Sequence, residues 1–159
     1  MAASTQAVAG RLSLQCQTIA SDCTAIRSLD WDRSRFDIEF GLRNGTTYNA
    51  FLVRGERTVL IDTSHAKFRE TWLPLLQEQI DPQAIDYLIV SHTEPDHSGL
   101  IGDLLDLNPE IEIVGSKVAL LFLKDPVHRP FRSRAVKSGD SLDLGTNPES
   151  GVEHRFEFL

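Results

Sequence analysis

Four side chains that can bind a metal ion lie within six residues, in the segment 91–99, which reads SHTEPDHSG. They are His92, Glu94, Asp96 and His97. Neutral imidazole and carboxylate oxygen suit first-row divalent metals, and the segment has no thiolate that would favour a structural zinc site. In an extended chain His92 and Glu94 point to the same side, whereas the adjacent Asp96 and His97 diverge. The spacing predicts two ligand pairs and suits two metals a few ångströms apart.

The segments on either side of these residues predict how they are positioned. The apolar run 87–90 is short and unbroken, which is typical of a buried strand. Residues 100–107 carry apolar side chains at helical spacing. Pro95 biases Glu94 towards an extended backbone, and Gly99 allows a close backbone approach. The alternative is that Asp96 only caps the helix and the histidines are surface residues, but four candidate ligands in six positions favour the metal site.

The motif His-x-Glu-x-Asp-His at 92–97 resembles the iron-binding motif of flavodiiron proteins, a branch of the metallo-β-lactamase fold. Segments 24–32, 36–41 and 44–49 resemble the multidomain flavodiiron proteins of oxygenic phototrophs. The likeness extends from about residue 11 to residue 145. It implies a metallo-β-lactamase-like αββα fold, of which this chain is the N-terminal portion only.

The resemblance also implies a ligand set and cofactors. His92 and Glu94 would bind one iron, and Asp96 and His97 the other. Two irons would reduce O2 to water, or act on NO, with electrons from NAD(P)H or a reduced carrier relayed by FMN. FMN and a second flavin are implied for the full-length parent only, because no Gly-rich phosphate loop is visible here. The family's remaining ligands lie beyond residue 145, so we expect the 159-residue stretch alone to be inactive.

Two other functions are weighed against this one. The first is a binuclear zinc metallohydrolase of the same fold, in which a histidine stands where this chain has Glu94. A carboxylate there adds negative charge and favours a harder, oxidisable metal. The second is a catalytically incomplete fragment. The intact four-residue ligand set counts against loss of chemistry within this stretch.

Asp62 ends a predicted strand over residues 58–62. Metallo-β-lactamase-like families carry an aspartate at this place, which implies that it holds a ligand or the metal-bearing loop. The alternative is a cap for a predicted helix over 64–79, and both readings stay open. Three further histidines are left out of the ligand set: His65 at the helix start, His128 in a loop and His154 in a strand-like alternation.

The order of the predicted elements indicates an α/β protein of the α+β sandwich type. A meander of half-buried strands comes first, followed by strands that alternate with helices. Asn44-Gly45 is a strong hairpin turn, and Gly139-Asp140 predicts a second hairpin over 136–144. The predicted strands are 12–18, 26–29, 36–40, 48–53, 58–62, 87–90 and 111–114, and the predicted helices are 64–79, 100–107 and 118–123.

Length and composition describe one globular domain. We expect residues 1–10 to be a disordered tail and residues 11–159 to form the incomplete diiron domain. The net charge of −7 argues against a nucleic-acid partner, and no apolar run approaches the ~20 residues of a membrane span. The two cysteines are expected to be reduced.

The expected location is a bacterial cytoplasm of the cyanobacterial type. Residues 1–21 are rich in Ser and Thr and poor in acids, as in a transit peptide to the chloroplast stroma. The resemblance to flavodiiron proteins begins near residue 11, however, and the residues before it are too few for a typical transit peptide. The resemblance further implies a homo- or hetero-oligomer with proteins of the same family.

Overall fold

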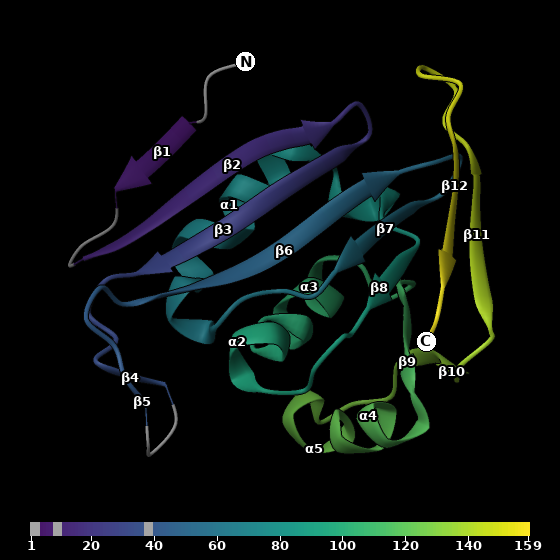
Figure 1. Ribbon diagram of the computed structural model, residues 1–159. Helices are drawn as coiled ribbons and strands as arrows, with labels where there is room; N and C mark the ends of the chain where they lie inside the picture. The colour runs from purple at the N-terminus through teal and green to yellow at the C-terminus, as the bar shows by residue number, and fades with distance from the viewer. Residues whose placement is uncertain (1–3, 8–10, 37–39) are drawn as a thin grey trace.

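The computed structural model describes residues 4–7, 11–36 and 40–159, and its centre is one eight-stranded sheet (Figure 1). The strand order is β1-β2-β3-β6-β7-β8-β9-β10. Two small sheets accompany it, β4 with β5 and β11 with β12. The strands are β1 (Ser4–Ala7), β2 (Leu12–Ala20), β3 (Cys23–Asp30), β4 (Arg35–Phe36), β5 (Phe40–Gly41), β6 (Thr46–Arg54), β7 (Thr58–Ile61), β8 (Tyr87–Ile89), β9 (Glu112–Ser116), β10 (Arg132–Val136), β11 (Ser141–Thr146) and β12 (Glu153–Glu157).

The helices are short. None in the described part of the chain has both the length and the apolar character that crossing a bilayer requires. They are the 3-10 helices η1 (Ala66–Phe68) and η2 (Pro82–Ala84), and the α-helices α1 (Arg69–Gln79), α2 (Pro95–Ser98), α3 (Ile101–Leu107), α4 (Lys117–Phe122) and α5 (Lys124–Val127).

The large sheet changes from antiparallel to parallel pairing at β7. Strands β2, β3, β6 and β7 form an antiparallel meander, in which Ile26 pairs with Ala50. Strands β8, β9 and β10 then run parallel to β7, with helical crossovers between them. The carboxyl ends of β7 and β8 therefore lie side by side and lead into Asp62 and Ser91. This mixed sheet with helical crossovers confirms the predicted α/β class.

Helices cover one face of the large sheet, behind the strands in the view of Figure 1. Trp72 and Leu76 of α1 and Leu104 of α3 are fully buried. They share one apolar cluster with the sheet residues Leu52 and Leu88. Burying a large apolar side chain contributes roughly 1.5–3 kcal/mol. This layer therefore fixes the strand ends from which the loop with the candidate ligands extends.

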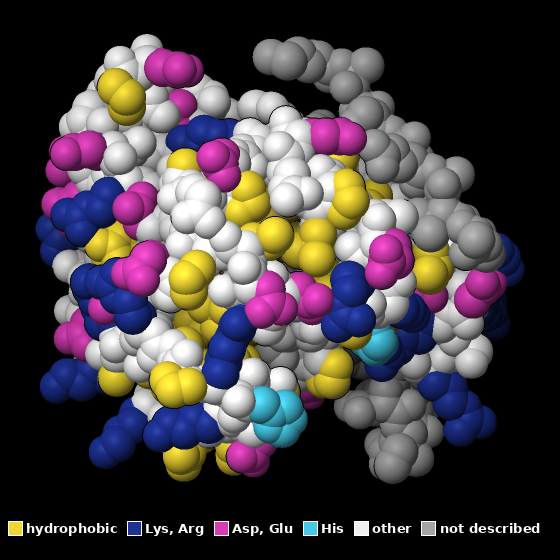
Figure 2. Space-filling view, turned by 180° about the vertical axis from the view of Figure 1, so that it is seen from behind, with side chains coloured by type: hydrophobic (Ala, Val, Ile, Leu, Met, Phe, Trp, Pro, Cys, Tyr) yellow, Lys and Arg dark blue, Asp and Glu magenta, His cyan; other side chains and the backbone are white. Residues whose placement is uncertain are grey.

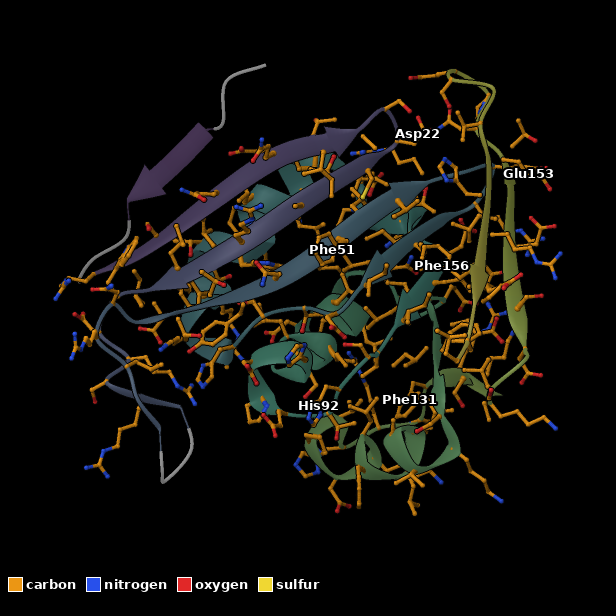
Figure 3. The ribbon with its side chains drawn as sticks, in the orientation of Figure 1. Asp22, Phe51, His92, Phe131, Glu153 and Phe156 are labelled. Atoms are coloured by element: carbon orange, nitrogen blue, oxygen red, sulfur yellow. The ribbon has the colours of Figure 1, made fainter. Side chains whose placement is uncertain are left out.

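The β11–β12 hairpin packs on part of the opposite face of the sheet. Leu142 and Leu144 of β11 are buried in a second apolar cluster with Val59 of β7. Phe156 of β12, labelled in Figure 3, packs against the same cluster. The predicted hairpin over 136–144 is therefore wrong. Val136 ends β10, which pairs in parallel with β9, whereas β11 pairs with β12.

The N-terminal segments differ from the prediction in two places, and one predicted strand is only partly described. Ser4–Ala7 forms β1 and pairs antiparallel with β2, where a disordered tail over 1–10 was expected. The predicted strand 36–40 includes residues 37–39, which lie outside the described residues. Asn44-Gly45 joins β5 to β6, but these strands are not paired with each other. The predicted turn at Asn44-Gly45 is nevertheless present, because Gly45 adopts a φ of +71°.

A buried carboxylate connects the β11–β12 hairpin to the β2–β3 turn. Asp22 accepts hydrogen bonds from Ser150 Oγ and from His154 Nε2, the latter at 2.8 Å. In Figure 3 the labelled Asp22 lies near the turn that joins β11 to β12. The hydrogen bonds from Ser150 and His154 hold the pKa of Asp22 below its ordinary value. The contact joins residues more than 120 positions apart, and it places His154 outside the ligand set.

The Asp22 contact predicts a pH-dependent contribution to stability. Its pKa is lower in the folded chain, so its stabilisation is present above the ordinary carboxyl pKa and is lost as pH falls through the folded value. Asp22→Asn should therefore destabilise the protein at pH 7, and the difference from wild type should shrink below about pH 4. Urea unfolding at several pH values measures this. A difference that stays constant with pH would contradict the carboxylate's role.

Candidate metal centre

The candidate ligands lie in the loop that follows β8. The strand ends at Ile89, and Pro95 begins the one-turn helix α2. Glu94 has the extended backbone that the following proline favours, with φ −64° and ψ 152°. No side chain caps α2 or the helix that follows it, α3, so the alternative in which Asp96 is only a helix cap is wrong. Asp96 lies instead inside the first turn, and it is buried.

The four side chains lie as two pairs. His92 Nε2 is 3.4 Å from Glu94 Oε1, and His97 Nε2 is 3.8 Å from Asp96 Oδ2. The two imidazole rings are stacked, with centroids 5.6 Å apart and planes at 25°. His92 and Glu94 are about half exposed, whereas the Asp96 side chain is 10% exposed. The loop thus presents an outer and an inner pair, with His92 labelled in Figure 3.

Asp62 contacts the inner pair. Its Oδ2 lies 2.9 Å from His97 Nδ1, and it accepts further hydrogen bonds from Ser91 N, at 2.8 Å to Oδ1, and from Ser91 Oγ. The residue has a φ of +56°, an uncommon conformation for a side-chain-bearing residue. The helix-cap alternative is wrong, because His65 caps η1 by accepting from Lys67 N.

The donor atoms of both pairs are of the kinds that bind a divalent metal ion. The Asp62 carboxylate accepts a hydrogen bond from His97 Nδ1, so in the neutral ring Nε2 carries no proton and is free to bind a metal, 3.8 Å from Asp96 Oδ2. Thr93 N donates to His92 Nδ1, so in the neutral ring the proton lies on Nε2, beside Glu94. A metal between His92 and Glu94 would replace that proton. Among the described residues no group of three or more His, Cys, Asp or Glu side chains is placed to hold one metal ion, so neither pair by itself completes a coordination shell.

Two hydroxyl groups, those of Thr63 and Ser98, form hydrogen bonds with the backbone of this loop. Thr63 N and Oγ1 both donate to His97 O, at 2.7 and 2.8 Å, and Leu100 N donates to Thr63 Oγ1 at 3.3 Å. Ser98 Oγ donates to Thr93 O and Glu94 O, at 2.9 and 3.0 Å. Thr63 is fully buried. In the sequence, the only signal for this role of Thr63 is that the residue directly follows Asp62.

At Gly99 the backbone of the loop closely approaches another backbone segment, as the sequence predicted. A Cβ atom here would lie 2.9 Å from both Ala66 N and Ser64 O and would collide with Pro95 O. At this residue the loop with the candidate ligands and the segment after β7 come into backbone contact.

His65 and His128 belong to neither ligand pair. His65 stacks on Tyr48, with ring centroids 6.1 Å apart. Burial, with a smaller contribution from the Arg33 guanidinium, lowers the pKa of His65, so the ring is neutral at pH 7. His128 ends α5 in a left-handed conformation, with φ +53°.

Comparison with known proteins agrees with this geometry. Residues 43–157 match the metallo-beta-lactamase superfamily. The chain is 65% identical over 149 residues to diflavin flavoprotein A 1 of Synechocystis sp. (strain PCC 6803), covering 94% of this chain and 25% of that protein.

Solved structures give the same result. The metal-soaked Flv1 flavodiiron core from the same strain has a TM-score of 0.76 at 32% identity, covering 83% of this chain and 34% of that one. Rubredoxin oxygen:oxidoreductase from Desulfovibrio gigas has a TM-score of 0.75 at 33% identity, and the match covers 82% of this chain and 33% of that one.

The chain spans about a quarter of the length of the curated relatives it matches. The resemblance to flavodiiron proteins and the metallo-β-lactamase-like fold are both confirmed. The chain belongs to the metallo-beta-lactamase superfamily, within which its relatives are the flavodiiron proteins, and it corresponds to an N-terminal portion of them.

Proposed function

We propose that this chain supplies one side of the diiron centre of an oxidoreductase that reduces O2 to water, with NO as the alternative gas. The observation that carries the proposal is the arrangement of four ligands as two adjacent pairs in one loop. His92 and Glu94 would bind one iron, and Asp96 and His97 the other. The names of the relatives support iron and flavin chemistry and leave the choice of gas open.

Residues around the pairs have defined roles in this proposal. Asp62 keeps the His97 proton on Nδ1, so that Nε2 is available to a metal. The Thr63 hydroxyl donates a hydrogen bond to the backbone carbonyl of His97 and so holds that residue in place. Glu94 places a negative charge where zinc hydrolases have a neutral imidazole, which stabilises a more highly charged metal. Two irons held in this way would supply one-electron redox chemistry at adjacent positions.

The full-length protein would complete the reaction. Reduction of O2 to two water molecules consumes four electrons and four protons, and we assign the electrons to NAD(P)H or a reduced carrier through FMN and a second flavin. We propose a cytoplasmic location, supported by the cyanobacterial relatives, and an oligomer formed with itself or a related protein. We propose that residues 1–159 alone do not turn over, because this stretch has no recognisable flavin-binding segment.

Replacing Glu94 with histidine tests the choice between iron redox chemistry and zinc hydrolysis. We expect Glu94→His to shift metal preference towards zinc and to lower O2 uptake by about tenfold or more. The full-length protein would be reconstituted anaerobically with equal amounts of Fe2+ and Zn2+, and its bound metal and NAD(P)H-dependent O2 uptake measured. A variant that kept iron and the wild-type rate would refute the role given to Glu94.

A matched control is Glu110→Gln. Glu110 is exposed, lies outside the ligand loop, and pairs with Arg132 at the surface. Its replacement removes one carboxylate from the same domain and should leave both metal preference and O2 uptake unchanged. Residues 1–159, reconstituted in parallel, should give no sustained O2 uptake beyond stoichiometric oxidation of added iron.

A further inference from the structure

His65 lies in the segment that follows β7, and two contacts hold its ring. The ring stacks on that of Tyr48, with centroids 6.1 Å apart and planes at 28°. Its Nδ1 accepts a hydrogen bond from Lys67 N at 3.2 Å. Among the described residues, none accepts a hydrogen bond from the other ring nitrogen, Nε2. The imidazole therefore has one orientation, and one of its polar atoms is available to a ligand.

The contact with Lys67 N fixes the position of the ring proton. A backbone N–H donates only to a nitrogen that has a free lone pair, so Nδ1 carries no proton. Burial, and to a smaller extent the Arg33 guanidinium, lowers the pKa of His65, so the ring is neutral at pH 7. The single proton of the neutral ring is then on Nε2. His65 is thus an uncharged N–H donor.

A buried network supports the ring on which His65 stacks. Asp30 is 1% exposed, accepts a hydrogen bond from the Tyr48 hydroxyl at 2.8 Å and pairs with the Lys67 amine. Arg33 Nη1 donates to the same phenol oxygen at 3.0 Å. Moving the Tyr48 ring would break a hydrogen bond to a buried carboxylate, which is costly. The network therefore fixes the plane against which the imidazole lies.

The residues on both sides of His65 contact the loop with the candidate ligands. Thr63 Oγ1 donates to His97 O at 2.8 Å. A Cβ atom on Gly99 would lie 2.9 Å from Ala66 N. Since its neighbours before and after meet this loop, the His65 imidazole is held next to it.

The charge of Asp96 acts on the same ring. It raises the pKa of His65 and of Tyr48, in both cases as the smallest of the contributions. The helix α2, which carries Asp96, packs against β6, which carries Tyr48. Acidic and basic side chains are intermixed over the helix-covered face, which Figure 2 shows, so the nearest charges decide the field at the ring. The imidazole thus lies within electrostatic range of the inner pair.

We propose that His65 is a hydrogen-bond donor of the metal centre, and that its Nε2–H binds an anion, or an oxygen atom of the substrate, held at the inner pair. A donor that is fixed before the reaction stabilises negative charge as it develops, and O2 gains negative charge as it accepts electrons. An uncharged donor does this without repelling the metal ions. The inference rests on the proposed function for its substrate. His65 keeps its proton throughout, so the protons that form water come from solvent.

The test uses the full-length protein loaded with Fe3+, and its probe is azide, a small anion that accepts hydrogen bonds. The dissociation constant of azide is measured from the change in absorbance. His65→Asn keeps an acceptor at the place of Nδ1, where Lys67 N donates, but has no donor at the place of Nε2. We expect it to raise the Kd of azide by about tenfold, the effect of losing one hydrogen bond to a charged group.

The matched variant is His65→Gln, because its amide N–H reaches the place of Nε2. It should keep the Kd of azide within about threefold of wild type. Both variants lack the stacked ring, so a purely structural role of His65 would give equal effects. Iron content should be unchanged in both, and unfolding curves establish that both are folded.

The position of the ring proton is measured without metal. In the iron-free full-length protein with 15N-labelled histidine, His65 should show a protonated Nε2 and an unprotonated Nδ1 at pH 7. Its signals are assigned by their absence from the spectrum of His65→Gln. A protonated Nδ1, or a ring protonated on both nitrogens, would overturn the proposal.

Three further results would overturn it. They are equal azide affinity in wild type and His65→Asn, equal loss in the two variants, and loss of iron from either, which would make His65 a metal ligand. His128→Asn, at an exposed histidine outside the loop, should leave azide affinity unchanged, and a tenfold loss there would show that the effect is not specific. If the azide difference persists in a protein that reduces neither O2 nor NO, the proposed function is refuted and this role of His65 is retained.

Discussion

Replacing His92 or Asp96 with alanine is expected to lower the iron content of the full-length protein from about two ions per chain to about one or fewer. Each substitution removes one ligand from a different pair, His92 from the outer and Asp96 from the inner. We expect O2 uptake with NAD(P)H to fall by about 100-fold or more in both variants, because the reaction needs two adjacent metals. Metal analysis and an oxygen electrode measure the two effects.

The matched control for this pair is His128→Asn. His128 is an exposed histidine outside the loop, and its φ of +53° is one that asparagine tolerates. Iron content and O2 uptake should both remain at wild-type levels. Full iron occupancy in His92→Ala and Asp96→Ala would remove the ligand assignment altogether.

Gly99→Ala is expected to destabilise the folded chain by about 3 kcal/mol. The added methyl group would lie 2.9 Å from Ala66 N and from Ser64 O, both of them backbone atoms that cannot rotate away. Relief of this overlap requires the loop with the candidate ligands to move away from the segment after β7, which would also separate Asp62 from His97. Metal affinity should therefore fall together with stability, as measured by urea unfolding and by titration with a divalent ion.

Gly102→Ala provides the comparison three residues further on. Gly102 lies inside α3, and a Cβ there meets nothing within 4 Å. Alanine at such a helical position should stabilise the protein by about 0.5–1 kcal/mol. If the two substitutions had equal effects, the close approach at Gly99 would not be what requires glycine.

The sequence by itself determined the local structure of the candidate site. The apolar run 87–90 gave β8, and the helical spacing over 100–107 gave α3. Side-chain alternation placed His92 with Glu94, and Pro95 kept Glu94 extended. These features depend on residues a few positions apart, so backbone geometry and local sterics are sufficient to predict them.

Only the tertiary structure decided which distant residues meet. Asp62 reaches His97 because β7 and β8 are parallel neighbours whose carboxyl ends coincide. The pairing of β11 with β12, against the predicted hairpin over 136–144, follows from burial of Leu142 and Leu144 on the sheet. Turn residues such as Gly139 permit a change of direction but do not specify which strands pair. Burial and hydrogen bonding across the assembled sheet choose the partner, and neither exists until the chain is folded.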